Sequence, residues 1–210
     1  MIRGAGDVLG PEQAGFIDNI GLDMYLKLLN EAVRDKLEGS ETEEEKVKLN
    51  LTLSLNAYIP DSYAKDGDKI ALYQEIISAV SVEQLNITRQ KIIDIYGKMP
   101  ESVELLIEKR RIDIASTEAC VKTLSERPNS IEIVLSDEYT KIRGIGNILF
   151  ECLIPYIRFT KVLYKNHEFY ITMQKDKKWL QNLRNILIGL ANILKTNKVI
   201  GDKREAHKWD

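Results

Sequence analysis

The sequence predicts an α+β fold in which an amphipathic helical arm precedes one compact domain. Three observations support this fold class. Residues 46–55 alternate between polar and apolar side chains, which is the period of a half-buried strand. Three helical segments then follow one another, and the last third combines strand patterns with a long amphipathic helix. Because helices and strands are grouped rather than strictly alternating, α+β is favoured over α/β.

The strand and the three helices after it have clear local signals. The apolar residues of the strand are Val47, Leu49, Leu51, Leu53 and Leu55. The first helix is predicted over residues 69–80. Ser81 and Gln84 form a capping box for the second helix, which ends at Gly97. Pro100 opens the third helix, since proline is favoured at the start of a helix.

The last third of the sequence predicts a region of strands and a short helix, followed by one long helix. We expect a strand over residues 130–135, a helix over 147–157 and a hairpin formed by 160–164 and 168–173. The final helix begins near Trp179 and carries a regular apolar stripe to Leu194.

The opening of the chain differs in character from the rest. Residues 22–37 have apolar side chains at three- and four-residue steps, which predicts an amphipathic helix. The acidic run 40–45 contains no apolar residue and is the best linker candidate. We therefore divide the chain into a loop and helix at 1–39, a linker at 40–45, a domain at 46–195 and a polar tail at 196–210.

Composition is typical of a globular protein. The 210 residues are 44% hydrophobic and 30% charged, and no apolar run is long enough to cross a bilayer. Cys120 and Cys152 have no metal-binding spacing and are expected to be reduced, buried thiols. These features favour a cytoplasmic protein without a membrane partner.

Charge is distributed unevenly along the chain. Residues 158–210 hold 12 lysines and arginines against five acidic residues, although the whole chain has a net charge of −2. This basic stretch has two interpretations: a nucleic-acid-binding surface within 158–208, or a solvated helix face beside an acidic neighbour. Phosphate contacts would give a DNA affinity that falls steeply with salt.

Known catalytic signatures are absent from the sequence. It contains no phosphate-binding Gly-x-x-x-x-Gly-Lys-Ser/Thr loop and no Gly-x-Ser-x-Gly nucleophile motif. The two histidines, His167 and His207, have no clustered cysteine or carboxylate partners. We therefore expect no enzyme activity, no cofactor and no metal site in this chain.

The glycine-rich opening segment is the leading candidate for a functional loop. The candidate residues are Arg3, Gly4, Gly6, Gly10, Gln13 and Gly15. Arginine offers five donors and glutamine both a donor and an acceptor, so the pair is able to bridge two moving segments. The alternative is a glycine-rich connector with a solvent-exposed arginine.

Two separated segments carry a resemblance to one family. The opening loop resembles that of the RecG and Mfd type of double-stranded-DNA translocases. Residues 59–63, 69–73 and 92–100 resemble the C-terminal domain of the Mfd family, the transcription-repair coupling factors. Together these matches cover roughly residues 2–115. Residues 141–156 and the residues after 195 have no clear counterpart in the family. A stand-alone helical adaptor is the remaining alternative.

The resemblance implies that this chain is the regulatory end of a longer motor protein. In the family, the motor uses ATP and Mg²⁺ to push on stalled RNA polymerase along duplex DNA and recruits the repair protein UvrA. The C-terminal domain covers the UvrA-binding module until the motor engages. By the same resemblance, Arg3 and Gln13 link ATP hydrolysis to movement.

Substitution of the loop arginine tests this assignment. In the complete motor protein, Arg3→Ala is expected to leave ATP hydrolysis measurable but to abolish movement on DNA, because a loop remote from the phosphates couples motion without doing chemistry. Gln13→Ala is expected to act alike, and the double variant to add little, since both residues would share one network. ATPase and strand-displacement assays measure the two activities separately. Loss of both activities together would contradict a coupling role.

Overall fold

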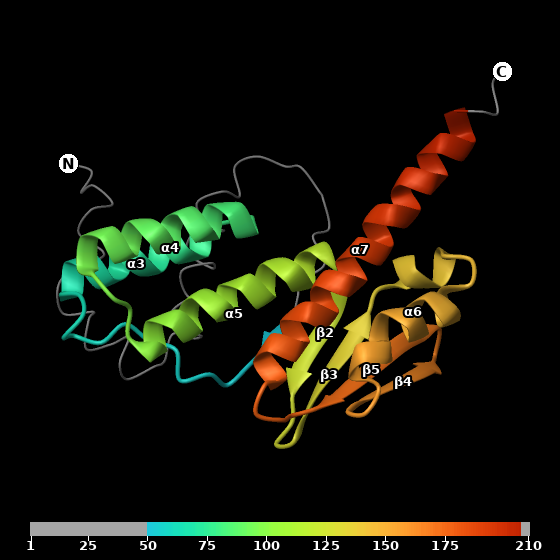
Figure 1. Ribbon diagram of the computed structural model, residues 1–210, viewed down its shortest axis with the longest axis horizontal. Helices are drawn as coiled ribbons and strands as arrows, with labels where there is room; N and C mark the ends of the chain where they lie inside the picture. The colour runs from blue at the N-terminus through green and yellow to red at the C-terminus, as the bar shows by residue number, and fades with distance from the viewer. Residues whose placement is uncertain (1–49, 207–210) are drawn as a thin grey trace, which may run out of the picture.

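The computed structural model describes residues 50–206, which form a sheet, a helical unit beside it and a long final helix (Figure 1). The helices are α3 (Asp66–Ser78), α4 (Val82–Tyr96), α5 (Glu101–Glu118), η2 (Asp137–Lys141), α6 (Ile145–Leu153), η3 (Ile154–Tyr156) and α7 (Trp179–Ala206). The strands are β1 (Asn50–Thr52), β2 (Val121–Glu126), β3 (Ser130–Leu135), β4 (Thr160–Lys165) and β5 (Glu168–Gln174).

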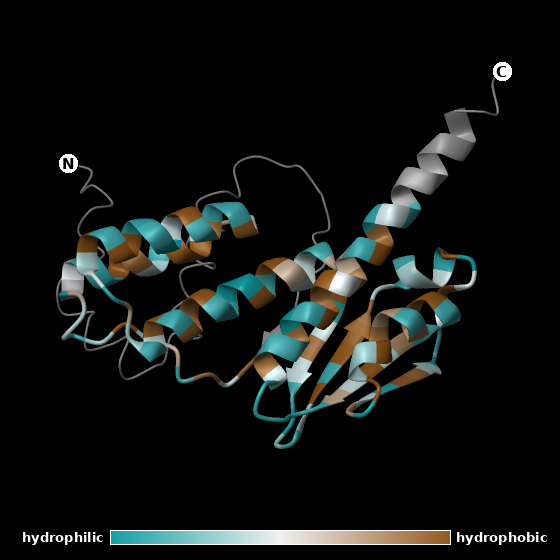
Figure 2. Ribbon diagram, in the orientation of Figure 1, coloured by the Kyte–Doolittle hydropathy of each residue, from teal (hydrophilic) through white to brown (hydrophobic). Residues whose placement is uncertain are grey.

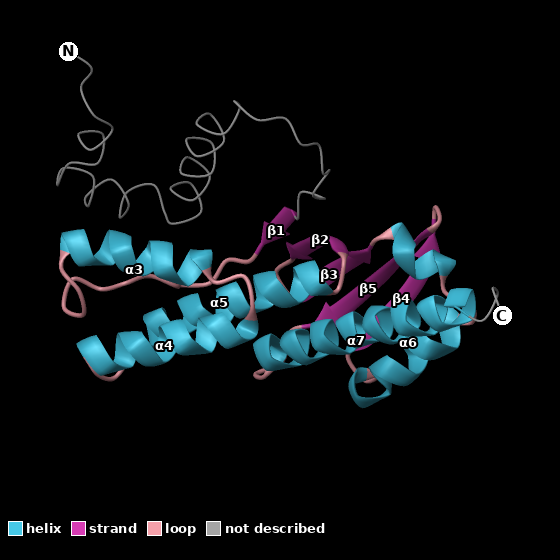
Figure 3. Ribbon diagram, turned by 90° about the horizontal axis from the view of Figure 1, so that it is seen from above, coloured by secondary structure: helices cyan, strands magenta, loops and turns pink. Residues whose placement is uncertain are grey.

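The five strands form one sheet in the order β1-β2-β3-β5-β4. β1 pairs with β2 in parallel, and the other neighbours are antiparallel. Seen from above, α6 and α7 lie together on one side of the sheet (Figure 3). This mostly antiparallel sheet with segregated helices confirms the predicted α+β class.

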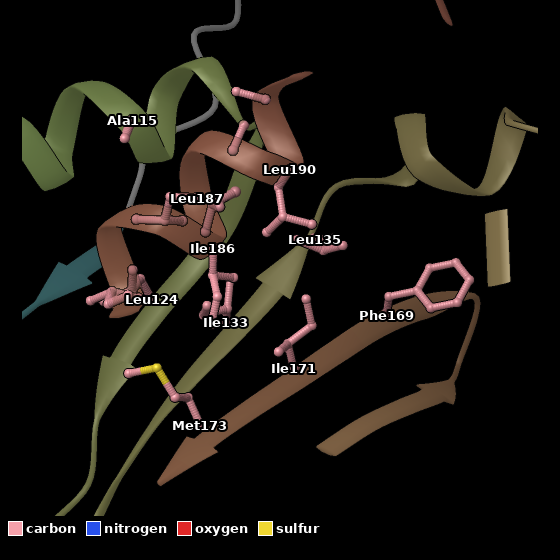
Figure 4. Packing of buried hydrophobic residues seen from close by; sticks show 14 of the residues in the cluster. Ala115, Leu124, Ile133, Leu135, Phe169, Ile171, Met173, Ile186, Leu187 and Leu190 are labelled. Carbon is pink, nitrogen blue, oxygen red and sulfur yellow. The ribbon is translucent and has the colours of Figure 1, made fainter. Parts of the chain in front are cut away.

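Two separate clusters of buried side chains stabilise the fold. One lies between the sheet and α5, α6 and α7, and includes Ile133, Ile171 and Leu187 (Figure 4). The other lies among α3, α4, α5 and the segment before α3, and includes Ile76 and Leu85. Helix α5 contributes to both clusters, so it joins the helical unit to the sheet unit.

The predicted helix boundaries near residues 81–100 are confirmed by the cap geometry. The backbone N–H of Gln84 donates to Ser81 Oγ at 3.2 Å, and the Gln84 side chain accepts from the N–H of Val80 at 3.0 Å. Gly97 ends α4 with a φ of 79°, a conformation that glycine adopts without strain. α5 begins directly after Pro100.

The strand predicted over 46–55 is shorter at its C-terminal end. Pairing with β2 ends at Thr52, and residues 46–49 lie outside the described residues. The N–H of Ser54 donates to the Glu126 carboxylate instead of to a strand carbonyl, and Leu55 O accepts from Ala57 N at 2.8 Å in a tight turn. These two bonds remove the chain from the ladder. The alternation of burial still continues, with Leu53 buried and Ser54 exposed.

The last third agrees with the prediction in part. β3, the β4–β5 hairpin and the start of α7 lie where expected, whereas β2 was missed. The helix predicted over 147–157 is divided into α6 and η3, since Pro155 cannot supply an amide hydrogen to continue an α-helix. α7 extends to Ala206 and does not end at the polar boundary predicted at residue 195.

Tyr139 joins three elements at the centre of the sheet unit. Its side chain is fully buried, and its hydroxyl lies 2.8 Å from Ala119 O after α5 and 3.1 Å from Leu190 O in α7. Burial raises the pKa of this hydroxyl, so it remains a neutral donor. η2 is thereby held against the C-terminal end of α5 and the middle of α7.

Removal of the Tyr139 hydroxyl is expected to destabilise the fold. Tyr139→Phe leaves a buried carbonyl without this donor and should cost about 1–2 kcal/mol, which thermal denaturation would detect as a lower Tm. Tyr170→Phe is the matched control, because the Tyr170 hydroxyl bonds Glu168 near the surface and its loss should change the Tm little. Equal shifts for both variants would contradict the structural role of Tyr139.

Candidate functional site

The glycine-rich loop predicted as a functional element lies outside the described residues. This applies to Arg3, Gln13 and all four candidate glycines, and also to the predicted helix 22–37 and linker 40–45. Their coupling role stays a prediction. The candidate site within residues 50–206 must therefore be sought among exposed and charged side chains.

The described part of the chain presents several exposed apolar and charged surfaces. Among these residues no group of three or more histidine, cysteine or acidic side chains is arranged to hold a metal ion. None of the described helices is long and apolar enough to cross a membrane. Cys120 and Cys152 are half-buried rather than fully buried, and burial raises the pKa of the Cys152 thiol.

An ionic network ties α4, α5 and α7 together. Arg184 of α7 donates to both carboxylate oxygens of Glu108 in α5, at 2.7 and 2.9 Å. Arg111 donates to Glu108 at 2.8 Å and to Asn86 of α4 at 3.1 Å. Because Glu108, Arg111 and Arg184 are only partly exposed, solvent screens this network less than an open surface pair.

Further ion pairs neutralise part of the basic C-terminal stretch. Lys195 of α7 pairs with Glu118 at 2.7 Å. Lys175 pairs with Glu126, and its ammonium group lies 5.1 Å from the centre of the Trp179 ring. These contacts favour the interpretation of a basic stretch beside acidic neighbours.

A different part of the basic stretch remains open to solvent. Exposed Arg158 and Lys161 line a polar groove of about 670 Å³ together with Thr172, Gln174 and the paired Lys175. Within residues 50–206, this groove is the candidate nucleic-acid-binding surface. The hairpin tyrosines do not line this groove and have partners elsewhere, since the Tyr164 ring packs on Phe169 at 4.7 Å and the Tyr170 hydroxyl donates to Glu168.

The outer face of α4 exposes isolated isoleucines. Ile87 is 70% exposed and Ile95 is 62% exposed, and Val80 is also exposed at the turn before the helix. Lys91 and Asp94 lie on the same outer side, and Lys91 is paired with Glu75 of α3. We name Val80, Ile87 and Ile95 the α4 surface.

A second apolar surface lies at the other end of the molecule, where α6 and η3 meet β4. Its exposed side chains include Phe150, Ile154, Ile157 and Val162. Phe150, Ile157 and Val162 line a groove of about 300 Å³, which is also lined by Leu149, Leu153 and Phe169. Both α6 and β4 carry brown, hydrophobic residues in Figure 2. The sequence predicted a helix and a hairpin in these segments but not which of their apolar side chains are exposed, so this surface was not predicted.

The fold is that of an α+β domain with a mostly antiparallel sheet. The TRCF domain family matches residues 53–143. Transcription-repair-coupling factors of Staphylococcus haemolyticus and Staphylococcus epidermidis are each 34% identical to the chain, over 203 and 184 residues. These alignments cover 96% and 87% of this chain but only 17% and 16% of those relatives.

A solved structure has the same fold. The crystal structure of the C-terminal domain of transcription-repair coupling factor superposes with a TM-score of 0.62 at 21% identity, covering 70% of this chain and 94% of that one. Residues 53–143 belong to the TRCF domain family, and the chain as a whole is similar to part of the transcription-repair-coupling factors. The predicted resemblance is therefore confirmed, and it extends well past the segment 2–115 that carried it in the sequence.

Adjacent residues of α6 test whether the second apolar surface is needed for folding. Leu149 is 1% exposed, and Leu149→Ala is expected to cost about 2–5 kcal/mol because it leaves a cavity. Phe150 is 56% exposed, and Phe150→Ala should cost less than about 1 kcal/mol. Urea denaturation measures both. A large loss for Phe150→Ala would show that this ring stabilises the fold rather than an interaction.

Proposed function

We propose that this chain is a non-catalytic regulatory domain of an ATP-dependent DNA translocase that couples transcription to repair. The domain would cover the UvrA-binding module of the same protein until the motor engages stalled RNA polymerase on duplex DNA. Membership in the TRCF domain family and similarity to coupling factors support this role. ATP and Mg²⁺ would bind the motor of the complete protein, and Arg3 and Gln13 would couple their use to movement.

The α4 surface is the observation on which this proposal chiefly rests. Its exposed isoleucines stand apart from one another on an otherwise polar helix, so they are tolerated in water when no partner covers them. Such a surface makes a weak contact. A regulatory cover has to be weak, because it must be released when the motor engages.

A weak contact is sufficient within one polypeptide. Two modules joined by a short flexible linker experience an effective concentration on the order of millimolar. A contact with a dissociation constant of about 0.1 mM would then be closed most of the time, yet its opening would cost little free energy. The helical unit is rigid enough to present such a contact, since its own cluster packs α3 and α4 onto α5.

A nucleic-acid-binding role is the second candidate. The polar groove bordered by Arg158 and Lys161 favours it. The pairing of Arg184 with Glu108 and of Lys195 with Glu118 weighs against it, because these paired charges are not free to replace the counterions of DNA. The regulatory role is therefore the better supported of the two.

Charged side chains on the α4 surface should uncover the UvrA-binding module. In the complete protein, the double variant Ile87→Asp with Ile95→Asp is expected to raise UvrA affinity about tenfold, because a carboxylate cannot be buried in an apolar contact without a partner. Deletion of residues 46–210 should raise it at least as much. Equilibrium binding to purified UvrA measures both effects.

Ile188→Asp is the matched control, since Ile188 is an exposed isoleucine on α7 rather than on α4. It should leave UvrA affinity unchanged. If the deletion strengthens UvrA binding but the double variant does not, the cover uses another surface. If neither change alters the affinity, the masking role is wrong.

A further inference from the structure

β4 is an edge strand whose outer side has no partner among the described strands. It is last in the sheet order and pairs only with β5. Its residues from Lys161 to Lys165 are all exposed, whereas alternate residues of β5 are buried. An exposed edge with unpaired backbone groups is a template for pairing with another strand.

The hairpin register shows which backbone groups face outward. Asn166 and His167 form a two-residue turn with φ values of 52° and 62°, and Lys165 is opposite Glu168. In such a hairpin the residues flanking the turn exchange hydrogen bonds, and bonded pairs then alternate along the ladder. The N–H of Gln174 donates to Phe159 O at 2.7 Å. Phe159 and Gln174 are therefore a hydrogen-bonded pair, as the alternation that starts at Lys165 and Glu168 requires. The N–H and C=O groups of Val162 and Tyr164 therefore face away from β5.

One side of this edge is apolar. Val162 lines the groove of about 300 Å³ with Phe150, Leu153 and Ile157 of α6 and η3. A strand added beside β4 would direct the side chain opposite Val162 toward this groove, because paired residues share a face. An apolar side chain fits that position.

The other side of the edge carries positive charge. Lys161, Leu163 and Lys165 alternate with Val162 and Tyr164, so both lysines lie on the face opposite the groove. Neither lysine forms an ion pair with another residue of the segment 50–206. The nearest acidic position on the paired strand, Glu168, is engaged by Lys122 and by the Tyr170 hydroxyl.

The same charges disfavour a second copy of this chain as the occupant. Antiparallel pairing of two β4 strands centred on Leu163 would place Lys161 of one copy opposite Lys165 of the other. Like charges directly opposite one another destabilise a strand pair. The edge is complementary to acidic residues at these two positions instead.

From this edge, groove and charge pattern we propose that β4 binds an extended peptide segment by strand addition. The segment has an acidic residue, three apolar residues and a second acidic residue. Its two carboxylates lie opposite Lys161 and Lys165, and its second and fourth residues lie on the groove face. The pattern is symmetric, so it fits in either chain direction. This site is separate from the α4 surface and does not depend on the masking role.

A synthetic peptide tests the site. The probe is Ser-Glu-Val-Leu-Val-Glu-Ser, blocked at both ends, titrated into the full chain with binding followed by amide chemical shifts. The control peptide has lysine in place of both glutamates. We expect the acidic peptide to bind at least about tenfold more tightly, with shifts concentrated in β4 and α6. Equal affinity for the two peptides would overturn the charge argument.

Two pairs of variants separate strand addition from other modes of binding. Val162→Pro removes an outward N–H without breaking the ladder to β5 and should lower the affinity at least about tenfold. Val162→Ala keeps that N–H and should lower it by no more than about threefold. Lys161→Glu with Lys165→Glu should reverse the peptide preference, and Lys98→Glu in the exposed turn before α5 should not. Unchanged binding by Val162→Pro would rule out strand addition.

Three further outcomes are decisive. If Val162→Pro does not fold, the charge-reversal pair still tests the site, and loss of both peptides without reversal would overturn it. If duplex DNA binds at the β4 lysines and the acidic peptide does not, the edge is a nucleic-acid surface. If the wild-type chain dimerises through β4 and excludes the peptide, a second copy is the occupant.

Discussion

The whole domain depends on helix α5 being shared between two hydrophobic clusters. Its N-terminal half packs with α3 and α4 through residues such as Val103 and Ile107, and its C-terminal half packs under the sheet through Ile112 and Ala115. A helix that is buried on different faces along its length cannot have one clean apolar stripe. The two units therefore cannot move independently without exposing part of α5. Any contact made by the helical unit is held in a defined position relative to the sheet.

Charged side chains reinforce this junction, and the same ion pairs neutralise some of the basic residues of the C-terminal stretch. Glu108 of α5 accepts from both Arg111 and Arg184, and Lys195 reaches Glu118 near the end of the same helix. The excess positive charge of residues 158–210 is thus partly an internal complement to acidic residues earlier in the chain. Among the described residues of this stretch, Arg158, Lys161 and Lys165 are exposed at or near β4, and Lys177 and Lys178 are exposed before α7. The positively charged surface at β4 is small, so it suits a short acidic peptide segment better than a long stretch of nucleic acid.

The exposed apolar residues lie at two ends of the molecule and suit different tasks. The α4 surface has isolated isoleucines on a helix, which favours a weak contact that is easily released. The β4 edge has a groove, outward backbone groups and flanking lysines, which together specify the spacing of a partner. One domain is therefore able to be bound by two partners without competition between them. In a regulatory domain, this separation allows one contact to persist while the other opens.

Local patterns in the sequence were enough to determine the fold class, the caps at Ser81 and Gly97, the hairpin after Thr160 and the family, because each depends on residues close together in the chain. The early end of β1 and the assignment of β2 were not predictable in this way. The first depends on Glu126 bonding Ser54, 72 residues away, and β2 has no clear alternation because its pairing with β3 is irregular. The candidate surfaces also required the tertiary structure. Phe150 and Leu149 are neighbours of equal apolar character, and only the packing of α6 on α7 and the sheet decides that one is exposed and the other buried.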